Sequence, residues 1–319
     1  MMMAQQPNKR KEYGLKSSDL KRLSKRTPYY WVRDLILDWA IMIGAFTAVG
    51  LYPNVFTVLI AFLIIGNRQH ALALLGHDGT HVTISYNSKL NDFLTNFFTW
   101  IPIGLTLDGY RNLHRYHHSE LGTENDPEVI YKAIRSEQWN LPKNAIDVLK
   151  MAALDLVGNG IPDYKVIFLY SKPTDKKEYY YLFGCHAVVS GLLVASGLWW
   201  VPAIWYVSLP TAFIMFFRIR LWLEHHGTDT THRLHLNPIQ GALFAPHLSW
   251  HHWEHHNWPS VPYHNLPALR KLVSGKEVMS FSDLIAYYQS CADIPAGTAL
   301  KETVRNTSKA KNPAYVESF

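Results

Sequence analysis

The sequence predicts an all-α membrane protein with four transmembrane spans, arranged as two helical hairpins with a cytoplasmic helical cap that is rich in histidine. Three observations support this prediction. The chain contains four apolar segments, each close to the roughly 20 residues that a helix needs to cross a bilayer. Very short turns join these segments in pairs. Basic residues gather before the first segment and are missing from the turns.

The four apolar segments follow one another as two pairs. They cover about residues 34–51, 55–76, 181–200 and 203–223. Residues 52–54 form the turn of the first pair, and residues 199–202 form the turn of the second. Because both turns are so short, each hairpin must return to the side of the membrane from which it started. Buried helices of a soluble protein are the alternative, and two adjacent pairs of this length disfavour it.

The distribution of charge orients the predicted hairpins. The first 33 residues hold nine Lys or Arg, whereas the two turns hold none. By the positive-inside rule, both termini and the loop 77–180 are cytoplasmic. The net charge of +6 is thus typical of a basic flank beside a membrane, and we expect no nucleic-acid partner. The first apolar stretch starts near Leu35, too far from the N-terminus for a cleavable signal peptide.

We expect the chain to divide into three parts: a basic cytoplasmic tail (1–30), a membrane domain (31–296) and a polar C-terminal tail (297–319). The apolar stretch 93–107 is too short to span a bilayer comfortably, so we expect a re-entrant or interfacial helix there. The chain has only two cysteines, which excludes a disulfide framework and a cysteine-based metal site.

Histidine is the most informative residue type in this chain. Of the 17 histidines, eight fall into one HxxxH box and two HxxHH boxes, where random sequence would give about 0.05 HxxHH matches. These eight are His77, His81, His114, His117, His118, His252, His255 and His256. On a helix, positions i, i+3 and i+4 share one face, so each box directs its imidazoles toward one point. Imidazole binds iron, zinc, copper and nickel, and the boxes therefore predict a metal site.

A ninth histidine extends this set. Glu224-His225-His226-Gly227 follows the last apolar segment, just as the first box follows the second segment. His225 would then lie level with the first box, with His226 as the alternative. Nine imidazoles are too many for one metal ion and suit two. The HExxH motif of metal hydrolases is missing from the chain, which disfavours a hydrolytic site.

These boxes, in this order and on a plan of two membrane hairpins, resemble the integral-membrane fatty acid desaturase superfamily, which also includes carotenoid ketolases, alkane hydroxylases and sphingolipid desaturases. Asn125-Asp126-Pro127, the Glu-His pair after the last segment and residues 259–262 (PSVP) fit the same pattern. The resemblance covers roughly residues 31–285. It implies that the nine histidines hold two iron ions, that O2 is the co-substrate, and that a double bond is introduced into a lipid acyl chain.

Other functions remain open from the residues. Hydroxylation or ketolation of a carotenoid or lipid begins with the same hydrogen abstraction, although the PSVP sequence favours a desaturase. A non-enzymatic haem- or metal-binding membrane protein is a remote alternative, because the histidines cluster outside the apolar segments. The resemblance also implies an external electron donor, ferredoxin or cytochrome b5, since the chain has no His-Pro-Gly-Gly element. A basic surface would steer an acidic donor.

Several further side chains are candidates for supporting roles. Four carboxylates are candidates for orienting the imidazoles, with an ordinary solvated acid as the alternative for each, and these are Asp78, Asp126, Glu224 and Glu254. Three arginines near the spans have either a functional role or a position that reaches the membrane surface, and these are Arg68, Arg218 and Arg220. Residues expected to line the substrate entry are Asp108, Tyr110, Arg111 and Asn112. The tryptophans near the third box, Trp250, Trp253 and Trp258, are expected at an interface belt or in packing.

Overall fold

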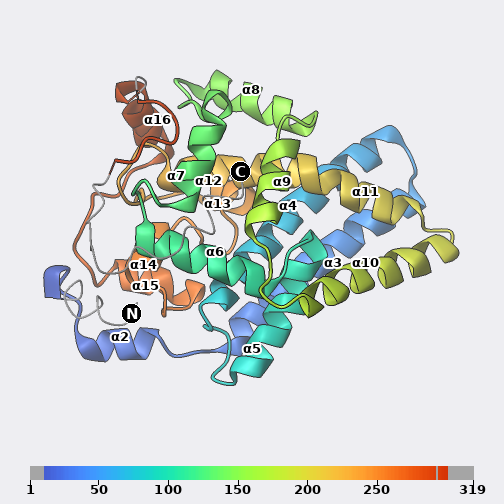
Figure 1. Cartoon of the computed structure of the whole chain (residues 1–319), viewed down its shortest axis with the longest axis horizontal. Helices are drawn as coiled ribbons and strands as arrows, with labels where there is room; N and C mark the ends of the chain where they lie inside the picture. The colour runs from blue at the N-terminus through green and yellow to red at the C-terminus, as the bar shows by residue number, and fades with distance from the viewer. Residues whose placement is uncertain (1–10, 292–293, 301–319) are drawn as a thin grey trace.

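The computed structural model describes residues 11–291 and 294–300. Over these residues the fold is helical, with a single β-bridge between Leu234 and Met279, so the predicted all-α class is confirmed. Long helices extend to one side of the molecule, and short helices gather at the other (Figure 1).

The long helices are α3 (Pro28–Leu51), α4 (Val55–Thr80), α10 (Lys177–Ala195), and a continuous rod of α11 (Trp200–Ser208), a π-helical turn (Leu209–Phe213) and α12 (Ile214–His225). The short helices are α2 (Ser17–Leu23), α5 (Ser88–Thr95), α6 (Leu107–Glu120), α7 (Pro127–Ile134), α8 (Ala145–Leu156), α9 (Ile161–Tyr170), α13 (Pro238–Phe244), α14 (His252–Asn257), α15 (Leu266–Arg270) and α16 (Phe281–Ser290). We call α6–α9 together with α13–α16 the cap.

The first hairpin matches the prediction closely. Asn54 ends the short turn and caps α4, because its side chain accepts hydrogen bonds from the backbone N–H groups of Phe56 and Thr57. Helix α4 continues beyond the predicted apolar segment to Thr80. Its last turn therefore carries His77, as expected for a box that follows the second segment without a break.

The second hairpin turns a few residues earlier than predicted. Helix α10 ends at Ala195, and Gly197 adopts a left-handed backbone with φ of 77° before α11 begins at Trp200. The predicted turn at 199–202 is therefore wrong in its position, because the glycine and not the proline reverses the chain. Pro202 lies instead in the first turn of α11, where its missing N–H costs no hydrogen bond.

In the described part of the chain, three helical segments are long and apolar enough to cross a membrane: Pro28–Leu51, Val55–Thr80 and Trp200–His225. The 19-residue α10 does not qualify. Many apolar side chains of the long helices face outward, among them Ile36, Phe56 and Leu192, which are 61%, 73% and 66% exposed. Apolar surfaces of this extent need a partner or a membrane to cover them.

Helix α4 lies at the centre of the long helices, between α3 and the α11–α12 rod. The rod approaches closely at Gly66, where a Cβ atom would lie 2.4 Å from the Cβ atom of Ala212. The contact at Gly66 keeps two helices together whose ends carry His77 and His225. The predicted interfacial stretch 93–107 consists of the end of α5, a π-helical turn (Asn96–Trp100) and a 3-10 turn (Ile101–Ile103), and it leads into α6.

The arginines of α12 point into the protein. Arg218 is 1% exposed and pairs with Asp155 of α8 and Asp163 of α9, with N–O distances of 2.5 and 3.3 Å. Burial raises the pKa of Asp155 to about 6, and the Arg218 charge opposes this shift. The Arg218 side chain therefore lies inside the protein and does not reach the membrane surface, which was one of the two positions expected for it. The ion pairs attach the cap helices α8 and α9 to the rod.

Candidate metal centre

The nine predicted histidines meet at the junction of the long helices and the cap. The end of α4 contributes the first box, α6 the second, the end of α12 contributes His225, and α14 the third box. Their ring nitrogens form two groups: one of five that all lie within 4.8 Å of one another, and one made of two smaller sets, each within 4.8 Å, that share His225. One group contains His77, His81, His114, His118 and His255. The other is formed by His117, His225 and His256, and His252 joins it through His225 and Glu224.

In the first group, Nε2 of His114 lies 2.9 Å from Nε2 of His81 and 3.0 Å from Nε2 of His118. His77 and His255 close the group, with ring centroids 4.4 Å apart. Because α6 presents His114 and His118 one turn apart, the box spacing alone places both rings on the same side of the helix.

In the second group, Nε2 of His252 lies 2.7 Å from Nε2 of His225 and 3.0 Å from Nε2 of His256. The His117 ring lies 4.8 Å from the His225 ring, measured between centroids. Two helices that are far apart in sequence, α12 and α14, thus bring their imidazole nitrogens face to face.

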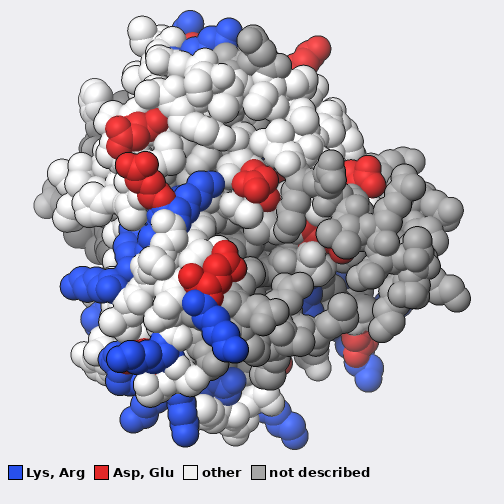
Figure 2. Space-filling view, turned by 90° about the vertical axis from the view of Figure 1, so that its left-hand side faces the viewer, with Lys and Arg blue, Asp and Glu red and all other residues white. Residues whose placement is uncertain are grey.

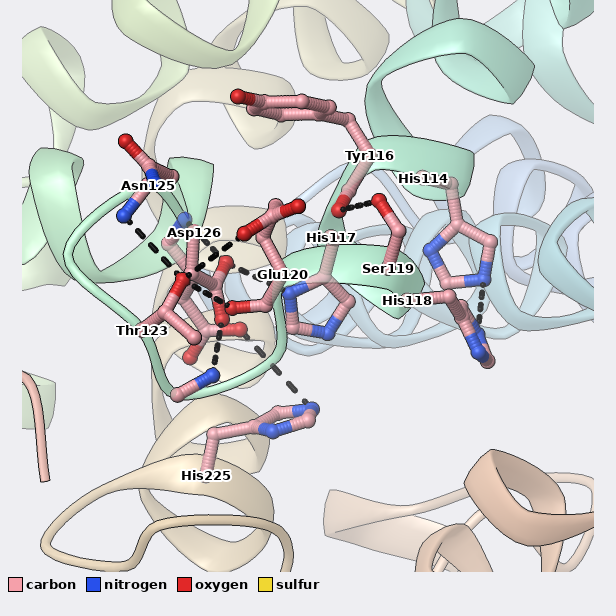
Figure 3. A network of polar contacts seen from close by, with 12 residues as sticks. His114, Tyr116, His117, His118, Ser119, Glu120, Thr123, Asn125, Asp126 and His225 are labelled. Carbon is pink, nitrogen blue, oxygen red and sulfur yellow. Dashed lines mark hydrogen bonds and ion pairs between the residues drawn. The ribbon is translucent and has the colours of Figure 1, made fainter. Parts of the chain in front are cut away.

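Hydrogen bonds fix the orientation of two rings in the second group, and Figure 3 shows His117 beside Asp126. Nδ1 of His117 lies 2.8 Å from Oδ1 of Asp126, and Nδ1 of His225 lies 3.3 Å from the carbonyl oxygen of Thr230. Both partners accept a proton, so each ring carries its hydrogen on Nδ1 and directs the lone pair of Nε2 into the cluster.

Eight of the nine histidines have a lowered pKa, whereas burial lowers the pKa of His117 and the charge and hydrogen bond of Asp126 outweigh burial and raise it. Burial, and then the neighbouring histidine His118, lower the pKa of His114 well below its usual value. Burial lowers the pKa of His81 to about 3, and burial followed by the nearby His81 lowers that of His255. These imidazoles are therefore neutral at pH 7, and the neutral ring is the form that binds a metal ion.

The geometry fits bound metal ions. Nε2 of His77 and Nε2 of His255 are buried without a hydrogen-bond partner among the described residues, and unpaired buried polar atoms are costly. Two nitrogens that bind one ion at about 2.1 Å and at right angles lie about 3 Å apart, close to the spacings in both groups. Two clusters of such nitrogens suit two ions better than one.

The four predicted carboxylates have different partners. Asp126 orients His117, as expected, and its side chain also accepts from the backbone N–H groups of Gly122 and Glu128, each at 2.9 Å. Asp78 accepts hydrogen bonds from the Thr83 hydroxyl and the Tyr263 backbone N–H, and contacts no imidazole through them.

Glu254, between the histidines of the third box, contacts two arginines. Its carboxylate lies 2.7 Å from Nε of Arg233 and 2.8 Å from Nη2 of Arg270. Burial would raise the pKa of Glu254, but the hydrogen bonds and charges of Arg270 and Arg233 outweigh burial and lower it. Glu254 therefore anchors α14 and does not orient an imidazole.

Two of the tryptophans near the third box are buried. Trp253 and Trp258 are 4% and 0% exposed, so they pack inside the protein and do not belong to an interface belt.

A largely apolar cavity of about 120 Å³ opens beside the histidines. Its wall includes five of the histidines, His77, His114, His117, His225 and His252, together with the apolar side chains of Leu113, Val166, Ile167, Phe217 and Leu221. Of the residues expected at a substrate entry, Tyr110 lines this cavity. Arg111 instead pairs with Asp92, and Asp108 binds Thr174.

The structure also adds residues that sequence reasoning missed. Glu128 lies 3.9 Å from Nε2 of His225 and lines the cavity, as does Tyr131. Two features of the sequence could have indicated Glu128. It follows directly after the Asn125-Asp126-Pro127 motif, and it has Lys132 at position i+4, with which it forms an ion pair.

The remaining histidines lie outside the two groups. The carbonyl oxygen of His226 accepts a hydrogen bond from the His232 ring, and the His226 ring packs near Trp139, so that His225 is the residue of this pair in the cluster. His247 contacts Asp38 of α3 at 2.8 Å, and Nδ1 of His251 contacts the carbonyl oxygen of Leu248 at 3.0 Å. Both are thus engaged in structural contacts.

The fold and the cluster define a class: a helical protein with several potential membrane spans and a polyhistidine metal centre at their end. A sequence model of the fatty acid desaturase family matches residues 53–280, which is more than half of the chain. The chain therefore belongs to the fatty acid desaturase family, as its histidine boxes predicted.

Two curated proteins are similar to this chain. An sn-1 acyl-lipid omega-3 desaturase (ferredoxin) from Nostoc sp. (strain 36) is 30% identical over 115 residues, which cover 36% of this chain and 30% of that protein. A chloroplastic omega-3 fatty acid desaturase from Glycine max is 28% identical over 222 residues, which cover 64% of this chain and 47% of that protein. The matches thus span less than half the length of either relative.

Proposed function

We propose that this protein is an O2-dependent di-iron desaturase that introduces a double bond into the acyl chain of a lipid. One observation carries the proposal: nine histidines converge in two groups, and five of them line a largely apolar cavity. A hydrolase or a haem protein needs neither arrangement. The family and the names of both relatives support acyl-chain desaturation over hydroxylation or ketolation.

The proposed cofactor is a pair of iron ions, held by His77, His81, His114, His118 and His255 on one side and by His117, His225, His252 and His256 on the other. When bound, the iron ions supply the oxidising power of dioxygen, which no side-chain acid or base can replace. The protein holds the His117 and His225 rings in place through Asp126 and the Thr230 carbonyl group.

The cavity walls have a separate task. Ile167 of α9 and Phe217 and Leu221 of α12 contribute apolar surface to the cavity that the histidines also line. Such surface binds methylene groups and excludes water, at about 0.8 kcal/mol for each buried CH2 group. An extended acyl chain is therefore held with its C–H bonds toward the metal centre, while bulk water is kept away from them.

For the membrane topology, we propose that α10 crosses the membrane as a fourth span beside the three long apolar segments. Its outward side chains Val188, Val189 and Leu192 are 62%, 56% and 66% exposed, which supports contact with lipid. Two hairpins then leave both ends of the membrane domain, and the cap, on the cytoplasmic side. The basic N-terminal flank supports this orientation.

For the electron donor, we propose a separate acidic carrier protein, with ferredoxin as the first candidate and cytochrome b5 as the second. The name of the Nostoc relative includes ferredoxin. Figure 2 shows Lys and Arg side chains gathered on the lower part of one face, at the height of α2, where Lys16, Lys21, Arg22 and Lys25 are exposed. A surface of this charge attracts an acidic partner and accelerates encounter.

Expression in a host of known lipid composition tests the function. Mass spectrometry of lipids and pigments should reveal an acyl chain with one additional double bond, in cells that produce the wild-type chain and not in cells with an empty vector. Hydroxylated lipid or oxygenated carotenoid with unchanged acyl chains would replace the desaturase proposal by the alternative chemistry. Purified protein with haem absorbance, or without iron, would overturn both.

A further inference from the structure

The two histidine groups are unequal. Five imidazoles converge in the first group, whereas the second contains four, which are His117, His225, His252 and His256. Glu224 is the acidic residue whose carboxylate oxygen falls within the second group, together with the ring nitrogens of His225 and His252. It precedes His225 at the end of α12 and is 2% exposed. A buried carboxylate therefore lies beside the four imidazoles of the second group.

Three electron-pair donors converge on one ring nitrogen. Nε2 of His252 faces Nε2 of His225 at 2.7 Å, Nε2 of His256 at 3.0 Å and Oε2 of Glu224 at 3.4 Å. A ring nitrogen carries at most one proton. His225 cannot supply a second from Nε2, since its proton is on Nδ1, directed to the Thr230 carbonyl oxygen. A cation between these atoms satisfies all of them at once, and a carboxylate oxygen is a suitable donor to it.

The neighbouring carboxylates are already engaged. Glu254 contacts arginine with both oxygens, and Asp126 faces the Nδ1 side of His117, away from the cluster. Glu128 pairs with Lys132 and stays 3.9 Å from His225. Glu224 also pairs with Arg220, whose Nη2 atom lies 2.7 Å from Oε2. One carboxylate has about four lone-pair sites, so Glu224 can pair with Arg220 and bind a metal ion at the same time.

We propose that Glu224 is a tenth metal ligand, which completes the second group as four imidazoles and one carboxylate. The two ions then differ: the first has only neutral nitrogen ligands, and the second has one anionic oxygen ligand. This inference rests on the proposed two-iron centre and assigns to Glu224 a role different from that of an ordinary counter-ion to Arg220.

Iron binding by the full-length protein in lipid nanodiscs tests the proposal. The wild-type chain, loaded anaerobically with ⁵⁷Fe(II), should bind two iron ions and give two distinct Mössbauer doublets. Glu224→Gln should weaken binding of one ion by about tenfold or more. At saturating iron, the doublet of this ion alone should change its quadrupole splitting, because its oxygen ligand has changed.

Two further variants separate the ligand role from the ion pair. Glu178→Gln removes a partly buried carboxylate of α10 that accepts a hydrogen bond from Asn96, outside both histidine groups and the cavity wall, and should bind two ions with the wild-type spectrum. Glu224→Gln combined with Arg220→Met removes the unpaired buried charge and should still show the weakened ion and the altered doublet.

The outcomes are distinguishable. Two tightly bound ions with an unchanged spectrum in Glu224→Gln would overturn the ligand assignment and leave the proposed function intact. Recovery of the wild-type spectrum in the double variant would also overturn it, because Glu224 would then act only through Arg220. A wild-type chain that binds no iron would instead overturn the proposed function itself.

Discussion

Nδ1 of His117 lies 2.8 Å from Oδ1 of Asp126, and the same carboxylate caps α7 through the Glu128 N–H group. One side chain thus fixes both an imidazole of the second histidine box and the start of the helix that follows it. The orientation of His117 depends on a loop that closes on its own box. Asp126 belongs to the Asn125-Asp126-Pro127 motif, and this contact is the physical reason for an acid at that position.

We predict that Asp126→Asn weakens iron binding by about tenfold to a hundredfold, since partners of metal-binding histidines typically contribute that much. The amide keeps one acceptor oxygen, which can still cap α7 through the Glu128 N–H group, so helix content measured by circular dichroism should not change. Iron titration of the purified protein provides the measurement. Asp147→Asn, at the exposed start of α8, is the matched control and should bind iron like the wild type.

His117→Ala should abolish both iron loading and formation of the unsaturated product. The ring supplies a nitrogen to the second group, and its loss leaves Asp126 without its buried partner. Iron content and lipid mass spectrometry measure the two effects. His235→Ala should have no effect on either, because this histidine is exposed and outside both groups. Full activity of the His117 variant would refute its assignment as a ligand.

Glu254→Gln should destabilise the protein by about 3 kcal/mol, because it leaves the charges of Arg233 and Arg270 without their buried partner. Thermal unfolding in detergent measures the loss. The pKa of Glu254 is lowered from 4.5, so its contribution is complete above that pH and disappears as the pH falls through the lowered value. The difference between wild type and variant should therefore shrink in acid, and a constant difference would contradict this account.

Ile167→Trp should reduce product formation by about tenfold while iron content stays at the wild-type level, because the larger side chain fills the apolar cavity. Leu169→Trp provides the control on the same helix, since Leu169 is 43% exposed and outside the cavity wall. Lipid analysis after expression at equal protein levels compares the two. Equal activity of both variants would show that the cavity does not hold the reacting chain.

The sequence predicted the hairpins and the convergence of nine histidines because both rest on local periodicity. Helical spacing places His114 and His118 on one face whatever surrounds them. The carboxylates could not be assigned in this way. Glu254 lies within a histidine box and yet contacts Arg233 and Arg270, whose positions depend on the path of the chain through the cap.

Arg218 illustrates the same limit. Its position near the end of an apolar segment is compatible with a side chain that reaches the membrane surface. Its buried position depends instead on ion pairs with Asp155 and Asp163. These acids lie about 60 residues earlier, in short helices without a distinctive sequence pattern. Long-range ion pairs of this kind are set by tertiary packing, which no local signal in the sequence encodes.

The α11–α12 rod contains a segment long and apolar enough to cross a membrane, two residues of the cavity wall, Phe217 and Leu221, and His225 at its end. These parts are joined by helical backbone without an intervening loop. At 1.5 Å per residue, about 12 Å along the axis separate Phe217 from His225. In the proposed function, the rod therefore fixes the distance between the lipid phase and the metal centre. Insertion of a single residue between these positions would turn His225 by about 100° around the helix axis. The histidine would then no longer lie in the second group, and an acyl chain bound at the cavity wall would no longer be aligned with the metal centre.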